Sequence, residues 1–191
     1  MLNVGSGATD APHRVHIDGS WQARLSRHPL MARLVSGVAV VYASHVIEHL
    51  HRDEARRFLE DARRVLKPGG ICRVVVPDVA SIVQWYLDHR SLVPRPDEAS
   101  SDVLMDMLGV RPKEVMGRRG PLSWYRAATD FDRHKWMYDI EGLSALVRES
   151  GFTEVEPKLY LESFIPRERL AAVEKADRVL NGAGICVESR K

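Results

Sequence analysis

The sequence has little that would tie the protein to a membrane, to nucleic acid or to an oxidising compartment. Its 191 residues include only two cysteines, and their formal net charge is +2. Cys72 and Cys186 each lie within an apolar, strand-like run, which favours reduced core residues over a disulfide framework. The small net charge gives no electrostatic reason to expect a nucleic-acid partner. No run reaches the ~18 apolar residues that a membrane span needs. We therefore expect a cytoplasmic protein without nucleic-acid or membrane partners.

Internal repeats and low-complexity tracts are also missing, so the chain most simply forms a single domain over residues 1–191. What is present is an alternation of short apolar runs and helical periodicities. The runs predicted to be strands are 2–4, 15–17, 38–44, 71–76, 152–155 and 185–187. The predicted helices follow Asp53 and Asp139 as N-caps, or span 79–87 and 167–180.

Punctuating residues separate these elements. Pro68-Gly69-Gly70 is expected to end the helix that follows Asp53, and Gly151 is expected to be the C′ residue of the helix that follows Asp139. Strands alternating with helices predict an α/β fold, a doubly wound, Rossmann-like and mostly parallel sheet with a late antiparallel strand. Between residues 91 and 135 the periodicity weakens, which indicates a partly helical insertion or lid.

Candidate binding residues follow the predicted strands at their carboxyl ends, where ligands bind on sheets of this kind. Gly5 and Gly7 frame a turn after the first strand, and the missing Cβ atoms allow close approach of a ligand to the backbone. Asp18 follows the second strand, where its carboxylate suits the hydroxyls of a ribose. Ser44-His45 and Pro77-Asp78 follow the next two strands.

These residues belong to five motifs in a characteristic order. They are Leu2–Gly7 (L-N-x-G-x-G), His16–Asp18, Ser44–Leu50 (S-H-V-x-E-H-L), Arg64–Gly70 (R-V-L-K-P-G-G) and Pro77-Asp78. With them the sequence resembles a class I S-adenosylmethionine-dependent methyltransferase. It is most similar to a small branch that includes O-methyltransferases of methylated mannose polysaccharides. The resemblance implies methyl transfer from S-adenosyl-L-methionine to a hydroxyl of a sugar, an oligosaccharide or a related metabolite.

The resemblance also implies roles for individual residues. Gly5, Ser6 and Gly7 would line the methionine part of the cofactor, and Asp18 would hold the ribose hydroxyls. Ala43, Ser44 and His45 would form the floor beside the sulfonium. The sequence departs from the family pattern at two places in this loop. Asn3 replaces the acidic residue that usually opens the glycine loop, and Ala8-Thr9 replaces its third glycine.

The stretch between Asp18 and Val38 is shorter than the family normally has, since a further strand and an acidic, adenine-contacting segment usually lie there. Either the adenine pocket is trimmed, or a flexible loop is missing from the sequence, and we favour the second.

Transfer to a hydroxyl requires a proton acceptor, and a histidine with a near-neutral pKa suits that task. His134 lies between the insertion and the last long helix, where an acceptor would enter, and is the preferred base. His45, on the cofactor side, is the second candidate. Asp130 and Asp132 are candidates to orient His134 or to bind a divalent cation such as Mg²⁺.

Two other functions stay open at this point. His45-x-x-Glu48-His49 matches the inverted zincin signature of a zinc metallopeptidase, with Glu48 as base and two histidines four residues apart. The preceding buried strand argues against the long helix that such a motif needs. The third hypothesis is a non-catalytic cofactor-binding module.

The apolar spacing of residues 79–108 makes a homodimer one further expectation.

Overall fold

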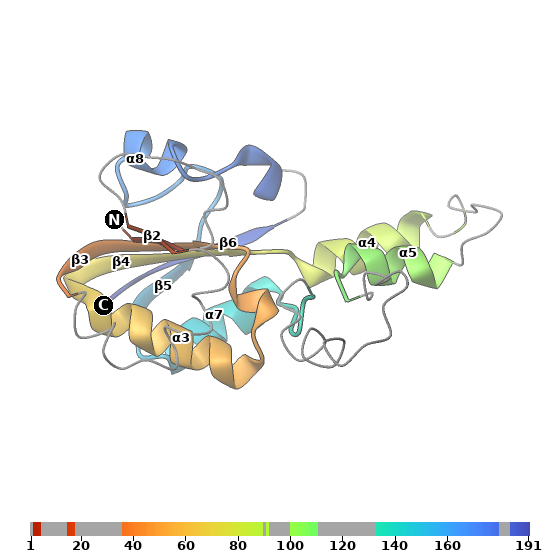
Figure 1. Ribbon diagram of the computed structural model, residues 1–191. Helices are drawn as coiled ribbons and strands as arrows, with labels where there is room; N and C mark the ends of the chain where they lie inside the picture. The colour runs from red at the N-terminus through yellow and green to blue at the C-terminus, as the bar shows by residue number, and fades with distance from the viewer. Residues whose placement is uncertain are drawn as a thin grey trace, which may run out of the picture.

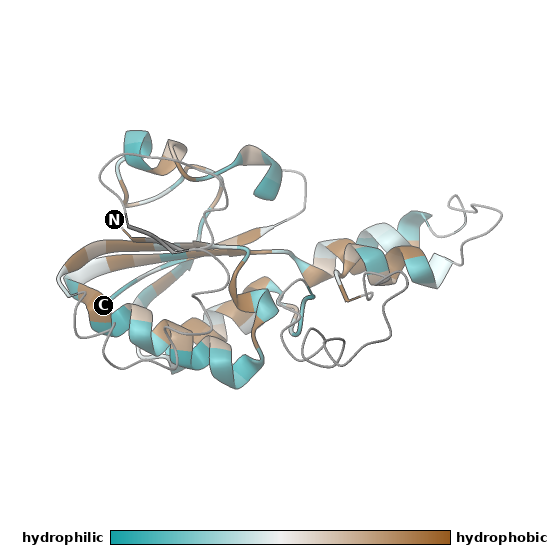
Figure 2. Ribbon diagram, in the orientation of Figure 1, coloured by the Kyte–Doolittle hydropathy of each residue, from teal (hydrophilic) through white to brown (hydrophobic). Residues whose placement is uncertain are grey.

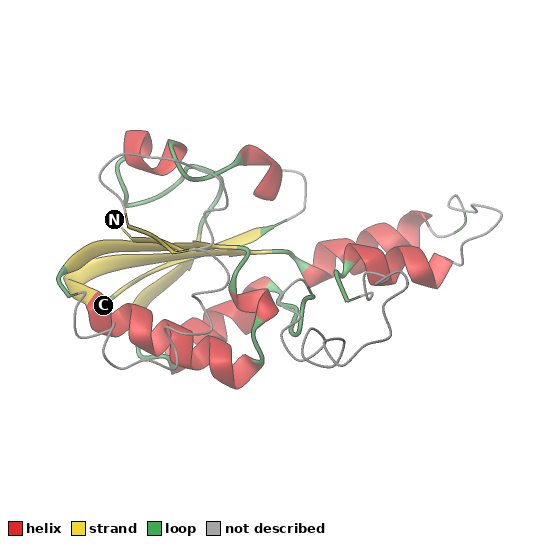
Figure 3. Cartoon of the chain, viewed as in Figure 1, coloured by secondary structure: helices red, strands yellow, loops and turns green. Residues whose placement is uncertain are grey.

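The computed structural model describes residues 2–4, 15–17, 36–89, 91, 100–110, 133–179 and 184–191. Within these ranges six strands form one sheet in the order β2-β1-β3-β4-β6-β5 (Figure 1). The strands are β1 Leu2–Val4, β2 Val15–Ile17, β3 Val38–Ser44, β4 Leu66–Val76, β5 Thr153–Pro157 and β6 Ile185–Arg190. The helices are η1 Ile47–His49, α3 Arg52–Val65, α4 Val79–His89, α5 Ser100–Met107, α7 Ile140–Glu149, α8 Arg167–Ala171 and η2 Ala176–Arg178 (Figure 3).

The sheet combines parallel and antiparallel pairs. β1 runs parallel to both β2 and β3, and β3 runs parallel to β4. β6 lies between β4 and β5 and is antiparallel to both. The register places Val4 opposite Ile17 on one side and opposite Ala43 on the other. The fold is therefore mixed α/β, and β6 is the late strand that runs against its neighbours.

Helices cover both faces of the sheet, with α3 and α7 on one face and α8 on the other (Figure 1). Side chains of β4 alternate between these faces, as strand geometry requires. Cys72, Val74 and Val76 join the core under α3 and α7, whereas Ile71 and Val75 join the core under α8. Because both faces are buried, residues 71–76 of this strand are apolar except for Arg73. Cys72 and Cys186 are both buried and unbridged, as expected.

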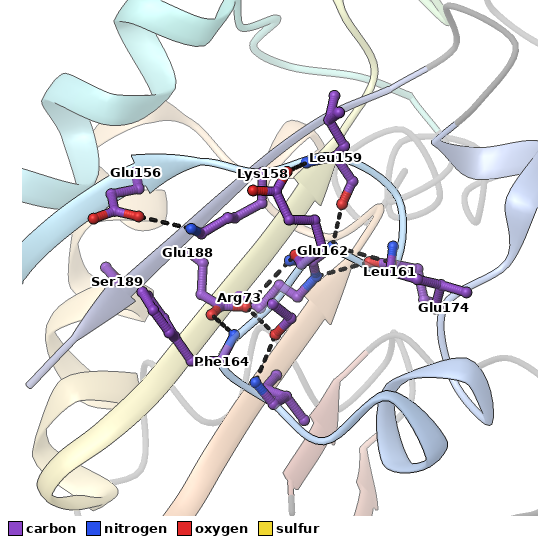
Figure 4. A network of polar contacts seen from close by, with 12 residues as sticks. Arg73, Glu156, Lys158, Leu159, Leu161, Glu162, Phe164, Glu174, Glu188 and Ser189 are labelled. Atoms are coloured by element: carbon purple, nitrogen blue, oxygen red, sulfur yellow. Dashed lines mark hydrogen bonds and ion pairs between the residues drawn. The ribbon is translucent and has the colours of Figure 1, made fainter.

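One charged residue of β4 points into the second face. Arg73 is fully buried, and its guanidinium donates to the carboxylates of Glu174 at 2.8 and 3.0 Å and of Glu188 at 3.1 Å (Figure 4). It also donates to the backbone carbonyls of Leu159 and Glu162. These contacts fasten the segment after β5 to β4 and β6. The sequence pattern gave no sign of this network, because a single arginine in an apolar run does not reveal its partners.

The start and end of α3 differ from the expectation. The N-cap is His51 and not Asp53, because the Glu54 carboxylate accepts a hydrogen bond of 3.1 Å from the His51 backbone N–H. Asp53 lies in the first turn, in an exposed pair with Arg57. The helix ends at Val65 and β4 begins at Leu66, so Pro68-Gly69-Gly70 belongs to the strand and does not end the helix.

The start of α7 agrees with the expectation. The Asp139 carboxylate accepts a hydrogen bond of 2.7 Å from the Gly142 N–H, which is the N-cap interaction. Gly151 follows the C-cap Ser150 with φ of +87°, the left-handed conformation of a C′ glycine. The helix predicted over 167–180 is wrong in extent. Helix α8 ends at Ala171, and in the described residues up to 179 the one helical element after it is the short 3₁₀ turn η2.

Helices α4 and α5 lie side by side and extend beyond the edge of the sheet (Figure 1). Helix α5 lies within the insertion expected at 91–135, whereas α4 ends at His89 and precedes it. Several apolar side chains on them are exposed: Val83, Trp85, Leu87 and Met105 (Figure 2 shows their helices). The expected homodimer stays a prediction. No helix among the described residues is both long and apolar enough to span a bilayer.

Candidate functional site

The carboxyl ends of the parallel strands meet at one edge of the sheet. Val4, Ile17 and Ala43 stand in line across β1, β2 and β3, so these three strands end at the same edge. The predicted cofactor residues Gly5, Ser6, Gly7 and Asp18 lie outside the described residues, as do Asp130 and Asp132. The site can therefore be built from the ends of β3 and β4 and from residues 133–138.

The chain turns sharply at the end of β3. His45 adopts a left-handed conformation with φ of +56°, which costs energy for any residue with a Cβ. Its backbone N–H donates to the Val75 carbonyl at 2.9 Å, so this corner is fixed to β4. The Ser44 hydroxyl lies 3.3 Å from His45 Nδ1. Ala43 and Ser44 are both buried, and a strained residue next to them is a feature found at functional sites.

Glu48 follows in the short turn η1. Its side chain is fully buried, and neither carboxylate oxygen has a hydrogen-bond partner. His49 Nε2 lies 3.9 Å from Glu48 Oε1, which is too far for a hydrogen bond. The Glu48 carbonyl oxygen accepts from the N–H groups of Lys135 and Trp136 at 2.7 and 3.2 Å. These two bonds hold residues 134–136 against η1.

Two histidines flank this carboxylate, and their rings meet edge to face at 4.9 Å between centroids. His49 Nδ1 lies 3.2 Å from the Arg133 carbonyl oxygen, and His134 Nδ1 lies 2.7 Å from the Leu108 carbonyl oxygen. A carbonyl oxygen only accepts, so each Nδ1 carries a hydrogen. In the neutral ring, Nε2 therefore holds the lone pair.

Burial controls the charge of these groups. Burial, together with the smaller effect of the nearby Arg178 guanidinium, lowers the pKa of His45 to about 4. Burial also lowers the pKa of His134, against the opposing effect of its bond to the Leu108 carbonyl. Burial raises the pKa of the Glu48 carboxyl to about 8. Near neutral pH the imidazoles of His45 and His134 are therefore uncharged, and each can act as a base or as a metal ligand.

The structure brings some of the predicted residues together and separates others. His45 and His134 both belong to this edge of the sheet, and their proximity contributes to the low pKa of His45. Asp78, which follows β4, instead accepts hydrogen bonds from the backbone of Ala80 and Ser81 and from the Ser81 hydroxyl. Its carboxylate is therefore the N-cap of α4.

The zincin interpretation does not fit the local fold. Its two histidines would have to lie on one α-helix, whereas His45 sits at a left-handed corner and Glu48-His49 lies in the 3₁₀ turn η1. The side chains that come together are Glu48, His49 and His134, whose candidate ligand atoms lie within 4.8 Å of one another. His45 is not a member of this group.

Each of these side chains was singled out from the sequence. Their proximity to one another, and the backbone groups that position them, were not predicted. Glu48 and His49 drew attention as part of a motif, but His134 is 85 residues further along the chain and no spacing rule connects them. The support of His134 by Leu108 and Gly109 had no sequence signal other than a glycine after an apolar helix.

The comparisons with known proteins agree with this location. Residues 36–74, which contain β3, η1, α3 and most of β4, match the family model described as a methyltransferase domain. No curated protein matches the sequence.

Solved structures of methyltransferases resemble the chain at low identity. An S-adenosylmethionine-dependent methyltransferase from Archaeoglobus fulgidus is 14% identical with a TM-score of 0.49, over 100% of this chain and 85% of that one. Human N-acetylserotonin methyltransferase, in complex with S-adenosylmethionine, is 11% identical with a TM-score of 0.44, over 100% of this chain and 39% of that one. This chain spans 32–39% of the length of three such structures. The matched segment 36–74 is thus similar to part of a methyltransferase domain.

Proposed function

We propose that the protein transfers a methyl group from S-adenosylmethionine to a hydroxyl group. One observation carries the proposal: the segment that matches a methyltransferase domain includes the corner after β3, where His45, Glu48 and His49 stand at the carboxyl edge of the sheet. That edge is where a sheet of this kind binds a nucleotide-like ligand.

The cofactor would bind along the same edge. Gly5, Ser6 and Gly7 directly follow β1, and Asp18 directly follows β2. We assign the methionine part to the glycine turn and the ribose hydroxyls to Asp18. The backbone at Ala43-Ser44-His45, fixed to β4 by the His45–Val75 hydrogen bond, would lie beside the sulfonium.

The proton acceptor in this reaction is a histidine. As the acceptor oxygen bonds to the methyl carbon, the bond from carbon to sulfur breaks and S-adenosylhomocysteine leaves. The hydroxyl proton then passes to Nε2 of His134, whose lone pair is fixed by the Nδ1–H bond to the Leu108 carbonyl. His45 is the second candidate, although its lower pKa makes it the weaker base.

The acceptor we propose is a sugar, an oligosaccharide or a related metabolite, as in polysaccharide biosynthesis in the cytoplasm. Trp136 supports this choice, since its side chain is 46% exposed two residues after His134. An exposed indole beside a candidate base offers a flat apolar surface for a carbohydrate ring.

Calorimetric titration with S-adenosylhomocysteine tests the cofactor site. We expect one saturable site in the chelator-treated protein, and at least ~10-fold weaker binding after Asp18→Ala, the loss expected for hydrogen bonds to a charged group. Asp53→Ala, at an exposed position on α3, is the matched control and should bind normally.

A transfer assay with labelled S-adenosylmethionine and oligosaccharide acceptors then tests the reaction. Cofactor binding without transfer to any hydroxyl acceptor would favour the non-catalytic module. Absence of cofactor binding in the folded protein would contradict the proposal as a whole.

A further inference from the structure

The group formed by Glu48, His49 and His134 has a composition and geometry that the methyl transfer does not require. These side chains come from η1 and from the segment before α7, and their candidate ligand atoms lie within 4.8 Å of one another. We infer that Glu48, His49 and His134 bind a divalent transition-metal ion.

The carboxylate of Glu48 is the strongest reason for this inference. A polar group removed from water without a hydrogen bond costs several kcal/mol, and an unpaired charge costs more. Glu48 is fully buried, and both of its carboxylate oxygens lack a hydrogen-bond partner. Oε1 lies 3.9 Å from His49 Nε2, and the candidate ligand atom of His134 lies within 4.8 Å of those of both residues. A cation there would give the carboxylate the partner that it lacks.

The two histidines are oriented as metal ligands usually are. A ligating imidazole typically donates its second N–H to a carbonyl or carboxylate, which fixes the ring and directs the other nitrogen at the metal. His49 and His134 donate from Nδ1 to the carbonyls of Arg133 and Leu108, at 3.2 and 2.7 Å. Both rings therefore carry their lone pair on Nε2, which faces the carboxylate in the case of His49.

The ligand set also indicates which ion fits. Ligands of a tetrahedral ion with bonds of about 2.1 Å stand ~3.4 Å apart, so the group needs side-chain shifts of about 1 Å to close on an ion. Two imidazoles with one carboxylate suit Zn²⁺, Mn²⁺, Fe²⁺ or Co²⁺, whereas Mg²⁺ prefers six oxygen ligands. The cation site expected at Asp130 and Asp132 lies outside the described residues.

Three protein ligands leave at least one coordination position open, as in catalytic metal sites. If the proposed methyl transfer holds, that position would take the acceptor hydroxyl, and the ion would lower the hydroxyl pKa. An ion and a proton cannot both occupy the one lone pair of His134. In the metal-bound protein His134 would therefore be a ligand and not the base. The hydroxyl proton would pass to His45, which is not a member of the group. This use of the ion rests on the proposed function, but binding of the ion does not.

Titration of the chelator-treated, full-length protein with Co²⁺ tests the inference, because Co²⁺ bound to nitrogen and oxygen ligands has visible d–d absorption bands. We expect one equivalent to bind. Glu48→Gln, His49→Ala and His134→Ala should each weaken binding by at least 10-fold, and Zn²⁺ should displace the Co²⁺ bands. His89→Ala, which removes a histidine on α4 outside the group, should bind as the unchanged protein does.

Circular dichroism identifies any variant that fails to fold, and Glu48→Gln is the decisive variant because it keeps the shape of the side chain. Absence of Co²⁺ and Zn²⁺ binding in the folded protein would overturn the inference, as would equal binding by the folded Glu48→Gln variant. A parallel titration with S-adenosylhomocysteine separates the two proposals. Loss of cofactor binding with an intact metal site would contradict only the methyltransferase, and the reverse would contradict only the metal site.

Discussion

The imidazole of His134 lies directly against Gly109, where an added Cβ would stand 2.5 Å from His134 Nδ1. Gly109 lies in the turn just after α5 with φ of +68°, a conformation that residues with a Cβ rarely adopt. Its carbonyl accepts from the His134 backbone N–H at 3.0 Å, and the preceding Leu108 carbonyl accepts from the ring. The turn after α5 therefore positions His134, and the described part of the insertion has a direct connection to the candidate site.

Gly109→Ala should displace His134 while leaving the rest of the fold in place. A misplacement of about 1 Å in a reacting or positioning group can reduce the rate ~10²-fold. We therefore expect methyl transfer and Co²⁺ affinity to fall by 10-fold or more, with little change in affinity for S-adenosylhomocysteine. Calorimetry and the transfer assay measure these quantities separately.

Gly69→Ala is the matched control for this prediction. Gly69 has nearly the same backbone angle, with φ of +70°, but nothing lies within 4 Å of an added Cβ. Both substitutions should cost ~1 kcal/mol of backbone strain, and only Gly109→Ala should affect the site. Equal functional effects in the two variants would show that strain, and not contact with His134, is responsible.

The buried carboxyl of Glu48 should make the metal-free protein less stable as the pH rises. Burial raises its pKa from an ordinary value of 4.5 to about 8 in the folded protein. Between these values the folded protein holds a proton that the unfolded chain has released, so the free energy of unfolding falls with increasing pH. The slope from this group is at most ~1.4 kcal/mol per pH unit.

Glu48→Gln removes this titration, so its stability relative to the unchanged protein should rise between about pH 5 and pH 8. Urea unfolding in the presence of a chelator measures the difference. Glu141→Gln, at an exposed position on α7, serves as the control and should show no such trend. A constant difference across this range would mean that Glu48 is ionised in the folded protein at all these pH values.

The fold was largely predictable because its signals are local. Val38–Ser44 is a continuous apolar run that becomes a strand buried on both faces, and Asp139 and Gly151 cap α7 as their residue types suggest. The errors are local as well. Asp53 is a good N-cap residue, but the N-cap is His51, whose backbone N–H donates to the Glu54 carboxylate. Residue preferences alone do not decide between two N-caps within one turn.

The candidate site was predictable in its parts and not in its arrangement. The motif around His45 indicated the carboxyl edge of the sheet, and His134 was selected for its chemistry. The grouping of His134 with Glu48 and His49 depends on two hydrogen bonds from residues 135 and 136 to the Glu48 carbonyl. Such contacts join backbone groups, which carry no sequence information.

Arg73→Met should destabilise the protein by about 3–5 kcal/mol, because it leaves the Glu174 and Glu188 carboxylates buried without their cation. Adding Glu174→Gln and Glu188→Gln should recover part of this loss, a coupling that a thermodynamic cycle measures by urea unfolding. Arg52→Met breaks an exposed pair with Glu149 and should cost at most ~1 kcal/mol. Additive effects of the three core substitutions would mean that Arg73 does not act through the two carboxylates.

Replacing His45 should reveal the strain at the corner after β3. At φ of +56° glycine is favoured over any residue with a Cβ, so His45→Gly should be more stable than His45→Ala by ~1 kcal/mol. The order should be reversed at Val46, where φ is −128° and alanine is the better residue. Urea unfolding of the four variants measures both differences, and the same order at both positions would show that the corner is not strained. If the strain serves to place the imidazole beside the cofactor, His45→Gly should lose methyl transfer even while it gains stability over His45→Ala, because strain at an active site can be part of how a reacting group is positioned.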